Sequence, residues 1–197
     1  MPLSRTVPRR LLHMRDIRLS GYEREDGLMD IEAHMTDMKT YSASNVDRNG
    51  IQAGEPLHDM WLRMTLTPEL EIVACEASMD ATPYSICPEV APNFERLVGL
   101  VIAKGFLTQA AQRVRGVDGC THLRELLQQV ATVAFQTRHG LRKPTDKPAP
   151  AHHLGAEPQM ARSMLNSCYA HNEAGPIAAR ARPAPAGQML KDGTIKS

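Results

Sequence analysis

The amino-acid sequence predicts an α+β fold in which an antiparallel sheet, built from two N-terminal hairpins, is covered by C-terminal helices. The first observation is an Asp-Gly pair at positions 26 and 27, between extended segments at residues 11–22 and 28–41. Asp-Gly between two such segments favours a hairpin turn. The second observation is another pair of alternating segments, residues 57–67 and 70–78. The third is a long run of apolar residues at helical spacing after both pairs.

In the first hairpin, the second strand is expected to have one apolar and one ionisable face, because successive side chains of a strand point to opposite sides. The apolar series is Met29, Ile31, Ala33 and Met35, and the ionisable series is Asp30, Glu32, His34 and Thr36. We expect His13 and Arg15 to join the ionisable face, with odd positions of the first strand opposite even positions of the second. This face is either an acid–base pocket or a solvated surface with incidental ion pairs.

Residues 42–55 are rich in Ser, Asn, Asp and Gly, and they are expected to form a working loop. If the helices cover one face of the sheet, this loop is predicted to close over a ligand that is bound on the other face. That expectation favours the acid–base pocket.

The second hairpin is expected to turn at Pro68-Glu69. In its first strand, the side chains of His58 and Asp59 are expected to point to opposite faces of the sheet. Alternation places His58 with the apolar residues and predicts a buried imidazole that acts as a general base. Asp59 is expected to orient the preceding loop or to pair with Arg63. We also expect Arg63 to lie close enough to Glu76 to pair, since the polar face of the third strand meets Ala74, Glu76 and Ser78 of the fourth.

Residues 79–92 contain three prolines and are predicted to cross the fold as an irregular segment. Asp80, Tyr84 and Cys87 lie on this segment and are expected to open on the same end of the sheet as His58 and Asp59. This convergence is the best site prediction. Three aromatic side chains are expected to line this site and to contact a ring or an acyl chain of a ligand: Tyr41, Trp61 and Tyr84. Packing in the core is their alternative role.

Helices are predicted from Pro92 to about residue 98, at residues 106–114 and at residues 121–137, with Asp118 or Thr121 capping the longest. Cys120 and His122 stand at the start of that helix. They fit a thiolate nucleophile, a pair of metal ligands, or a buried cap beside a hydrogen-bonding histidine. Because they lack further ligands at metal-site spacing, we predict no metal.

The composition bounds the classes of protein. The chain has 197 residues, 42% of them hydrophobic, and a net charge of +1. We expect an N-terminal arm (residues 1–10), a single domain (11–182) with a flexible excursion (138–158), and a disordered tail (183–197). No basic patch, apolar span or signal peptide is visible, so we predict no nucleic-acid partner, no membrane partner and a cytoplasmic protein.

Several stretches resemble a bacterial family known only as a domain of unknown function, DUF2889. They are GYEREDGLMDIEAHMTDMKTY (21–41), EPLHDMWLRMTL (55–66), DATPYSICP (80–88), LVGL (97–100), GVDGCTHLRELL (116–127) and NSCYAHNEAGP (166–176). The resemblance implies a small catabolic protein of soil bacteria that acts on aromatic or acyl compounds.

No phosphate loop, dinucleotide fingerprint, serine-hydrolase elbow or HExxH motif is present, so we expect no cofactor. The leading hypothesis is a lyase or decarboxylase that acts on an aromatic or hydrophobic acid or alcohol by acid–base chemistry. The predicted catalytic residues are Glu32, His58, Asp59, Asp80 and His122. The predicted substrate-binding residues are Arg15, Lys39, Tyr41, Trp61, Arg63, Tyr84, Cys87 and Cys120. The alternative is a non-catalytic ligand-binding or assembly protein. A homodimer is one arrangement considered, and the sequence does not settle the oligomeric state.

Overall fold

A computed structural model describes residues 3–4, 6–141 and 165–180. It divides the chain into two compact units, Met1–Arg142 and Lys143–Ser197. Most of the expected excursion and the whole expected tail lie outside the described residues, so the predicted limits of the domain stay a prediction. Residues 138–140 of that excursion belong to the last turn of a helix.

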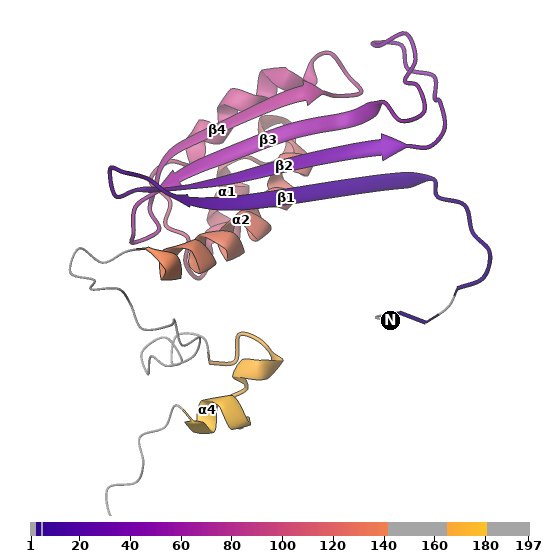
Figure 1. The fold of residues 1–197 in the computed structure, drawn as a ribbon. Coiled ribbons are helices and arrows are strands. Elements are labelled where there is room, and N and C mark those ends of the chain that lie inside the picture. The colour runs from indigo at the N-terminus through magenta and orange to yellow at the C-terminus, as the bar shows by residue number, and fades with distance from the viewer. Residues whose placement is uncertain (1–2, 5, 142–164, 181–197) are drawn as a thin grey trace, which may run out of the picture. The chain divides into compact units, whose positions relative to one another are not determined.

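The first unit is built on a four-stranded antiparallel sheet (Figure 1). Its strands are β1 (His13–Glu23), β2 (Met29–Lys39), β3 (Pro56–Leu66) and β4 (Ile72–Ala81), in the spatial order β1-β2-β3-β4. The two predicted hairpins are therefore confirmed. So is the expected pairing of Arg63 with Glu76, which lie opposite each other on β3 and β4 and form an ion pair.

The turn of the first hairpin is one residue longer than expected, and this corrects the predicted faces. The backbone N–H of Arg24 donates to the carbonyl of Leu28, which leaves three residues in the loop, and Gly27 takes the left-handed conformation at φ 83°. Odd positions of β1 consequently lie opposite odd positions of β2, as in the pair Arg15 and Asp37. His13 and Arg15 thus lie on the apolar side, not beside Glu32 and His34.

Helices cover one face of the sheet and enclose the core (Figure 1). They are the 3-10 helix η1 (Cys87–Leu97), α1 (Phe106–Arg113), the short η2 (Gly116–Asp118) and α2 (Thr121–Gly140). The buried side chains of α2 all belong to the apolar run at helical spacing, in which Phe135 is exposed: Leu123, Leu126, Leu127, Val130 and Ala134. They pack on a sheet face that includes Met29, Ile31, Ala33, Met35, Met60, Leu62 and Met64.

Two predicted local features are wrong. Residues 79–92 are not wholly irregular, because β4 continues to Ala81 and η1 starts at Cys87 with Pro92 inside it. Because proline has no backbone N–H, Pro92 cannot donate a hydrogen bond within η1. The N-cap of α2 is Cys120 rather than Asp118 or Thr121, and no side chain caps it.

The loop of residues 42–55 extends beyond the ends of β2 and β3 and does not roof the exposed face (Figure 1). Its own bridge between Ala43 and Ile51 shapes it. Asn45 donates to the carbonyl of Pro83, and Asp47 accepts from Ser85. These bonds hold the loop at the end of the sheet.

The second unit has two short described elements, η3 (Tyr169–His171) and α4 (Pro176–Arg180). The backbone N–H of Gly175 donates to the carbonyl of Asn172, which forms the turn between them.

Candidate active site

A buried carboxylate, Asp37, is the centre of the candidate site. It occupies the next position in the series Met29, Ile31, Ala33 and Met35, so alternation sends its side chain to the helix-covered face. The residue is only 2% exposed. Directly after the pair Asp37–His58 the register between β2 and β3 shifts, which marks a bulge. Such bulges re-aim side chains near functional sites.

Four donors converge on the two oxygens of Asp37. Arg15 donates from Nε to Oδ1 at 2.8 Å and from Nη2 to Oδ2 at 2.7 Å. Nε2 of His13 lies 3.0 Å from Oδ1, and Nδ1 of His58 lies 3.0 Å from Oδ2. A carboxylate offers about four lone-pair positions, so its hydrogen-bonding capacity is filled.

This set of donors decides the charge of Asp37. Burial alone raises the pKa of a carboxyl group, but the hydrogen bonds and charge of Arg15, together with His58 and His13, outweigh burial here. They lower the pKa of Asp37 from 3.8 to about 2. Asp37 is therefore ionised near neutral pH, and it can only accept hydrogen bonds.

His58 is the buried partner of this carboxylate. Burial and the neighbouring His122 lower the pKa of His58 below its ordinary value of 6.5, although Asp37 acts in the opposite direction. The imidazole is thus neutral near pH 7. Because Asp37 accepts only, the proton of His58 lies on Nδ1, and Nε2 carries a free lone pair. The prediction that His58 is on the buried side is confirmed.

The start of α2 brings Cys120 and His122 to the same place. The ring of His122 lies 4.0 Å from that of His58, centre to centre, at an angle of 39°. Sγ of Cys120 lies 3.9 Å from Nδ1 of His122, the outer limit of a sulfur hydrogen bond. Both residues are partly buried. Four elements thus contribute to one cluster of Arg15, Asp37, His58, Cys120 and His122, which we call the Asp37 cluster.

Arg15 links this cluster to the surface of α2. Its Nη1 donates to Oε2 of Glu125 at 2.6 Å, so the guanidinium bridges two carboxylates. Glu125 also lines a hollow of about 350 Å³ beside Leu107, Ala111, Thr121 and Arg124. This volume falls in the range of small-molecule sites. His58 does not line the hollow.

A metal ion has a possible site in the cluster. Ligand atoms of Asp37, His58 and His122 all lie within 4.8 Å of one another, and one carboxylate with two imidazoles is a common zinc set. Asp37 already accepts from Arg15, His13 and His58, so a cation would have to displace a donor and lie next to the guanidinium. The residues present fit a hydrogen-bonded base better than a metal.

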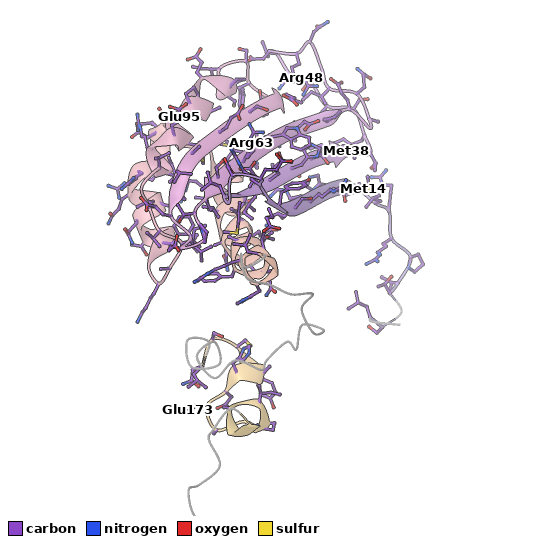
Figure 2. All side chains as sticks on the ribbon, turned by 60° about the vertical axis from the view of Figure 1, so that its left-hand side comes forward. Met14, Met38, Arg48, Arg63, Glu95 and Glu173 are labelled. Atoms are coloured by element: carbon purple, nitrogen blue, oxygen red, sulfur yellow. The ribbon has the colours of Figure 1, made fainter. Side chains whose placement is uncertain are left out.

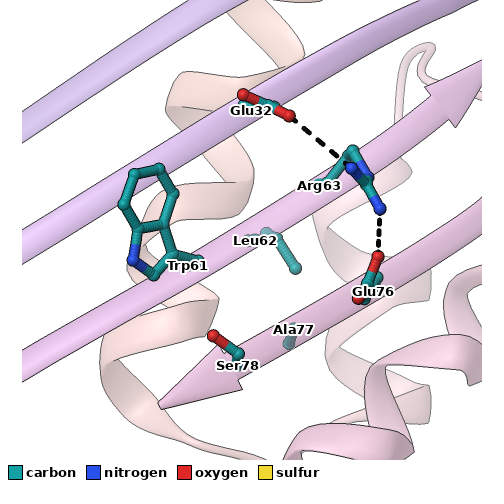
Figure 3. Close-up of a pocket in the computed structure, with 7 residues that line it drawn as sticks. All are labelled: Glu32, Trp61, Leu62, Arg63, Glu76, Ala77 and Ser78. Carbon is teal, nitrogen blue, oxygen red and sulfur yellow. Dashed lines mark hydrogen bonds and ion pairs between the residues drawn. The ribbon is translucent and has the colours of Figure 1, made fainter. Parts of the chain in front are cut away.

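The exposed face of the sheet holds a second histidine–carboxylate pair. Nε2 of His34 lies 2.7 Å from Oδ1 of Asp59, and Trp61 stacks on the His34 ring at 3.7 Å. The partner of Asp59 is therefore His34 and not Arg63. Arg63 instead lies between Glu32 and Glu76 in a shallow hollow of about 130 Å³ (Figure 3). Strand alternation separates this face from the Asp37 cluster.

The remaining predicted residues lie at the end of the sheet. Lys39 is opposite His13 in the β1–β2 register, and its Nζ lies 5.2 Å from the centre of the Tyr41 ring. Asp80 accepts from Ser78 on the exposed part of β4. Tyr84 is exposed, whereas Cys87 packs against the core. The three predicted aromatic residues thus have separate neighbours.

Comparisons with curated proteins and with solved structures find no match. No helix in the described part of the chain is long and apolar enough to cross a membrane. The model of one protein family, described as "Protein of unknown function (DUF2889)", matches residues 13–136. That stretch contains the four strands, η1, α1 and most of α2, together with every member of the Asp37 cluster. The chain therefore belongs to the DUF2889 family.

Proposed function

We propose that the protein is a small-molecule enzyme in which His58 is the general base and Asp37 holds it in position. The observation that carries the proposal is the buried contact of 3.0 Å between Nδ1 of His58 and Oδ2 of Asp37. An ionised carboxylate at Nδ1 fixes the tautomer and the orientation of an imidazole and stabilises the imidazolium that forms when it takes a proton.

The proton transfer follows from this tautomer. Nε2 of His58 takes a proton from a carbon or a hydroxyl of the substrate, while Nδ1–H keeps donating to Asp37. The imidazolium then returns the proton to the product. The low pKa of His58 favours the neutral, proton-accepting form before reaction. Arg15 holds Asp37 ionised and in place, so we assign it a positioning role and no longer a role in binding substrate.

The reaction class we propose is a lyase or decarboxylase reaction without a cofactor, on an aromatic or hydrophobic acid or alcohol, in a cytoplasmic protein. Apolar side chains such as Leu107 and Leu127 line the hollow beside α2, and Glu125 of the same hollow accepts from Arg15. Since His58 does not line this hollow, the hollow supports a hydrophobic substrate only as a binding surface next to the base. The alternative is a ligand-binding or assembly protein, in which the same cluster binds without a proton transfer.

The test starts from ligands that co-purify with the protein. Mass spectrometry identifies them, and product analysis shows whether the protein converts them. On a converted compound, His58→Gln should lower turnover by about 100-fold or more and leave the fold intact. His34→Gln is the matched control, because it removes an imidazole of similar contacts from the other face, and it should leave turnover unchanged.

Two outcomes would contradict this proposal. If His58→Gln destabilises the protein but turnover per folded molecule is unchanged, His58 is not the base. If a bound ligand is recovered unchanged under all conditions, the binding-protein alternative gains support.

A metal-dependent enzyme is the second candidate, and the proximity of Asp37, His58 and His122 favours it. In that case Zn²⁺ or a similar ion would supply a Lewis acid and an activated water. Elemental analysis of the purified protein distinguishes the two candidates. If the protein holds stoichiometric metal, and His122→Gln loses both the metal and the activity, the metal-dependent enzyme is the correct candidate.

A further inference from the structure

The two edges of the sheet differ. The β4 edge is covered at its start, where Gly99 donates to the carbonyl of Ile72 and Ile72 donates to that of Leu100. Along β1, by contrast, no strand in the described ranges pairs with the outer edge, which extends over 11 residues (Figure 1). A long open edge presents a row of unpaired N–H and C=O groups that can pair with another strand.

The hydrogen bonds at both ends of β1 show which groups face outward. The carbonyl of Leu12 accepts from Thr40, and the N–H of Arg24 donates to Leu28, so even-numbered residues bond toward β2. Alternation then points the N–H and C=O groups of odd-numbered residues, including Ile17, away from the sheet. The side chains of even-numbered residues lie on the face opposite the helices.

Two charged side chains of this strand differ from the others in having no partner among the described residues. Asp16 and Arg18 make no hydrogen bond or ion pair with any residue that the structure describes. Other charged side chains of the same face are paired, as in Arg24 with Asp30, His34 with Asp59, and Arg63 with Glu76. An unpaired Asp and an unpaired Arg two positions apart on an open edge are self-complementary in an antiparallel dimer.

We propose that two copies of this chain pair through β1, antiparallel, about a two-fold axis at Ile17. This register makes Ile17 face its own copy and places Asp16 opposite Arg18 of the partner subunit, twice. Moving the axis to Asp16 or to Arg18 would place like charges directly opposite each other, which is unfavourable. The charges therefore select one register.

The geometry of this register suits the ion pairs. Because even-numbered residues bond inward, Asp16 and the opposing arginine form a non-hydrogen-bonded pair, in which Cα atoms are only about 4.5 Å apart. The dimer has one continuous sheet with four strands from each copy. It pairs the two open β1 edges with each other through the same surface of both copies, so this contact closes at two copies. This proposal does not depend on the proposed enzyme function.

Sedimentation of the full chain tests the proposal. The wild-type protein should be a dimer at micromolar concentration, and Asp16→Arg or Arg18→Asp should raise the dimer dissociation constant by about tenfold or more. The double variant Asp16→Arg/Arg18→Asp restores opposite charges and should restore the dimer. Glu69→Arg, in the exposed turn between β3 and β4, changes the net charge as Asp16→Arg does and should have no effect. A monomeric wild type, or a double variant as weak as the single ones, would overturn the register.

A disulfide gives a second, geometric test. In this register Met14 lies opposite Ser20 of the partner subunit, and Figure 2 shows Met14 beside Met38 of β2 near one end of the sheet. Met14→Cys/Ser20→Cys should form a covalent dimer on oxidation. The two positions of one chain are about 20 Å apart along the strand, so the bond cannot form within it. Met14→Cys/Tyr22→Cys is the control for the register centred on Arg18, and faster cross-linking of that variant would reject the proposed register.

Discussion

Strands β2 and β3 carry one histidine–carboxylate pair on each face of the sheet. The distances are similar, 3.0 Å for His58 with Asp37 and 2.7 Å for His34 with Asp59. The surroundings differ, because the side chains of the first pair are 9% and 2% exposed and those of the second pair are 27% and 26% exposed. Because the histidine–carboxylate distances are similar and the exposures differ, any difference in stability or reactivity between the two pairs reports on burial.

Burial changes what each pair can do. On the covered face, Arg15, His58 and His13 donate to the buried Asp37 and together keep it charged. On the exposed face, water can replace either member of the pair at small cost. Loss of one partner should therefore destabilise the protein more in the buried pair than in the exposed pair. The buried imidazole is also the better positioned of the two for proton transfer.

The largest expected difference between the two faces is in stability. Asp37→Asn removes the charge that compensates Arg15 and places an amide N–H₂ among donors, so the free energy of unfolding should fall by about 3 kcal/mol. Asp59→Asn makes the same change on the exposed face and should cost less than about 1 kcal/mol. Urea unfolding of both variants measures this, and equal losses would show that burial does not distinguish the pairs.

The signal for Asp37 was present in the sequence. It is the first charged residue in phase with Met29, Ile31, Ala33 and Met35, and a charge in an apolar series needs compensating partners. Its partners were not predictable, because a hairpin loop of two residues and one of three place opposite faces of β1 against β2. That single residue decides whether Arg15 shares a face of the sheet with Asp37 or with Glu32.

Other parts of the prediction rested on stronger signals. The two hairpins and the long helix followed from alternation and helical spacing. The pairing of Arg63 with Glu76 followed from their shared polar face, whereas their direct opposition depends on a third loop residue, Leu70, and on a register shift after Thr65. His122 was predicted by residue type alone. Its contact with His58 joins positions 64 residues apart, and no local pattern encodes such a packing contact.

The stability difference between wild type and Asp37→Asn should depend on pH. The pKa of Asp37 is about 2 in the folded protein and near 3.8 without its partners. A carboxyl group whose pKa is lowered by folding contributes stability above its unfolded pKa and loses it as the pH falls. The difference in unfolding free energy between wild type and Asp37→Asn should therefore narrow by about 2 kcal/mol from pH 5 to pH 2. Urea titrations at both pH values check this.

His58 should also make the stability of the protein depend on pH, but near pH 6.5 rather than in strong acid. Folding lowers its pKa below 6.5, so its contribution is complete above pH 6.5 and is lost as the pH falls through the lower, folded value. Wild type should therefore lose stability relative to His58→Gln when the pH falls below 6.5. An NMR titration that finds the pKa of His58 above 6.5 would contradict the proposed neutral base.

The smallest effect is expected on the exposed face. Arg63 forms an ion pair with Glu76, and the side chains are 48% and 69% exposed, so water and salt screen the attraction. Glu76→Gln should lower the free energy of unfolding by about 0.5 kcal/mol, and this loss should vanish at 1 M salt. Thermal unfolding at low and high salt measures it, with Glu69→Gln in the neighbouring turn as a control for the lost charge. A loss as large as that of Asp37→Asn would mean that the hollow around Arg63 is far less solvated than its exposure indicates, and it would move the search for a ligand site to this face.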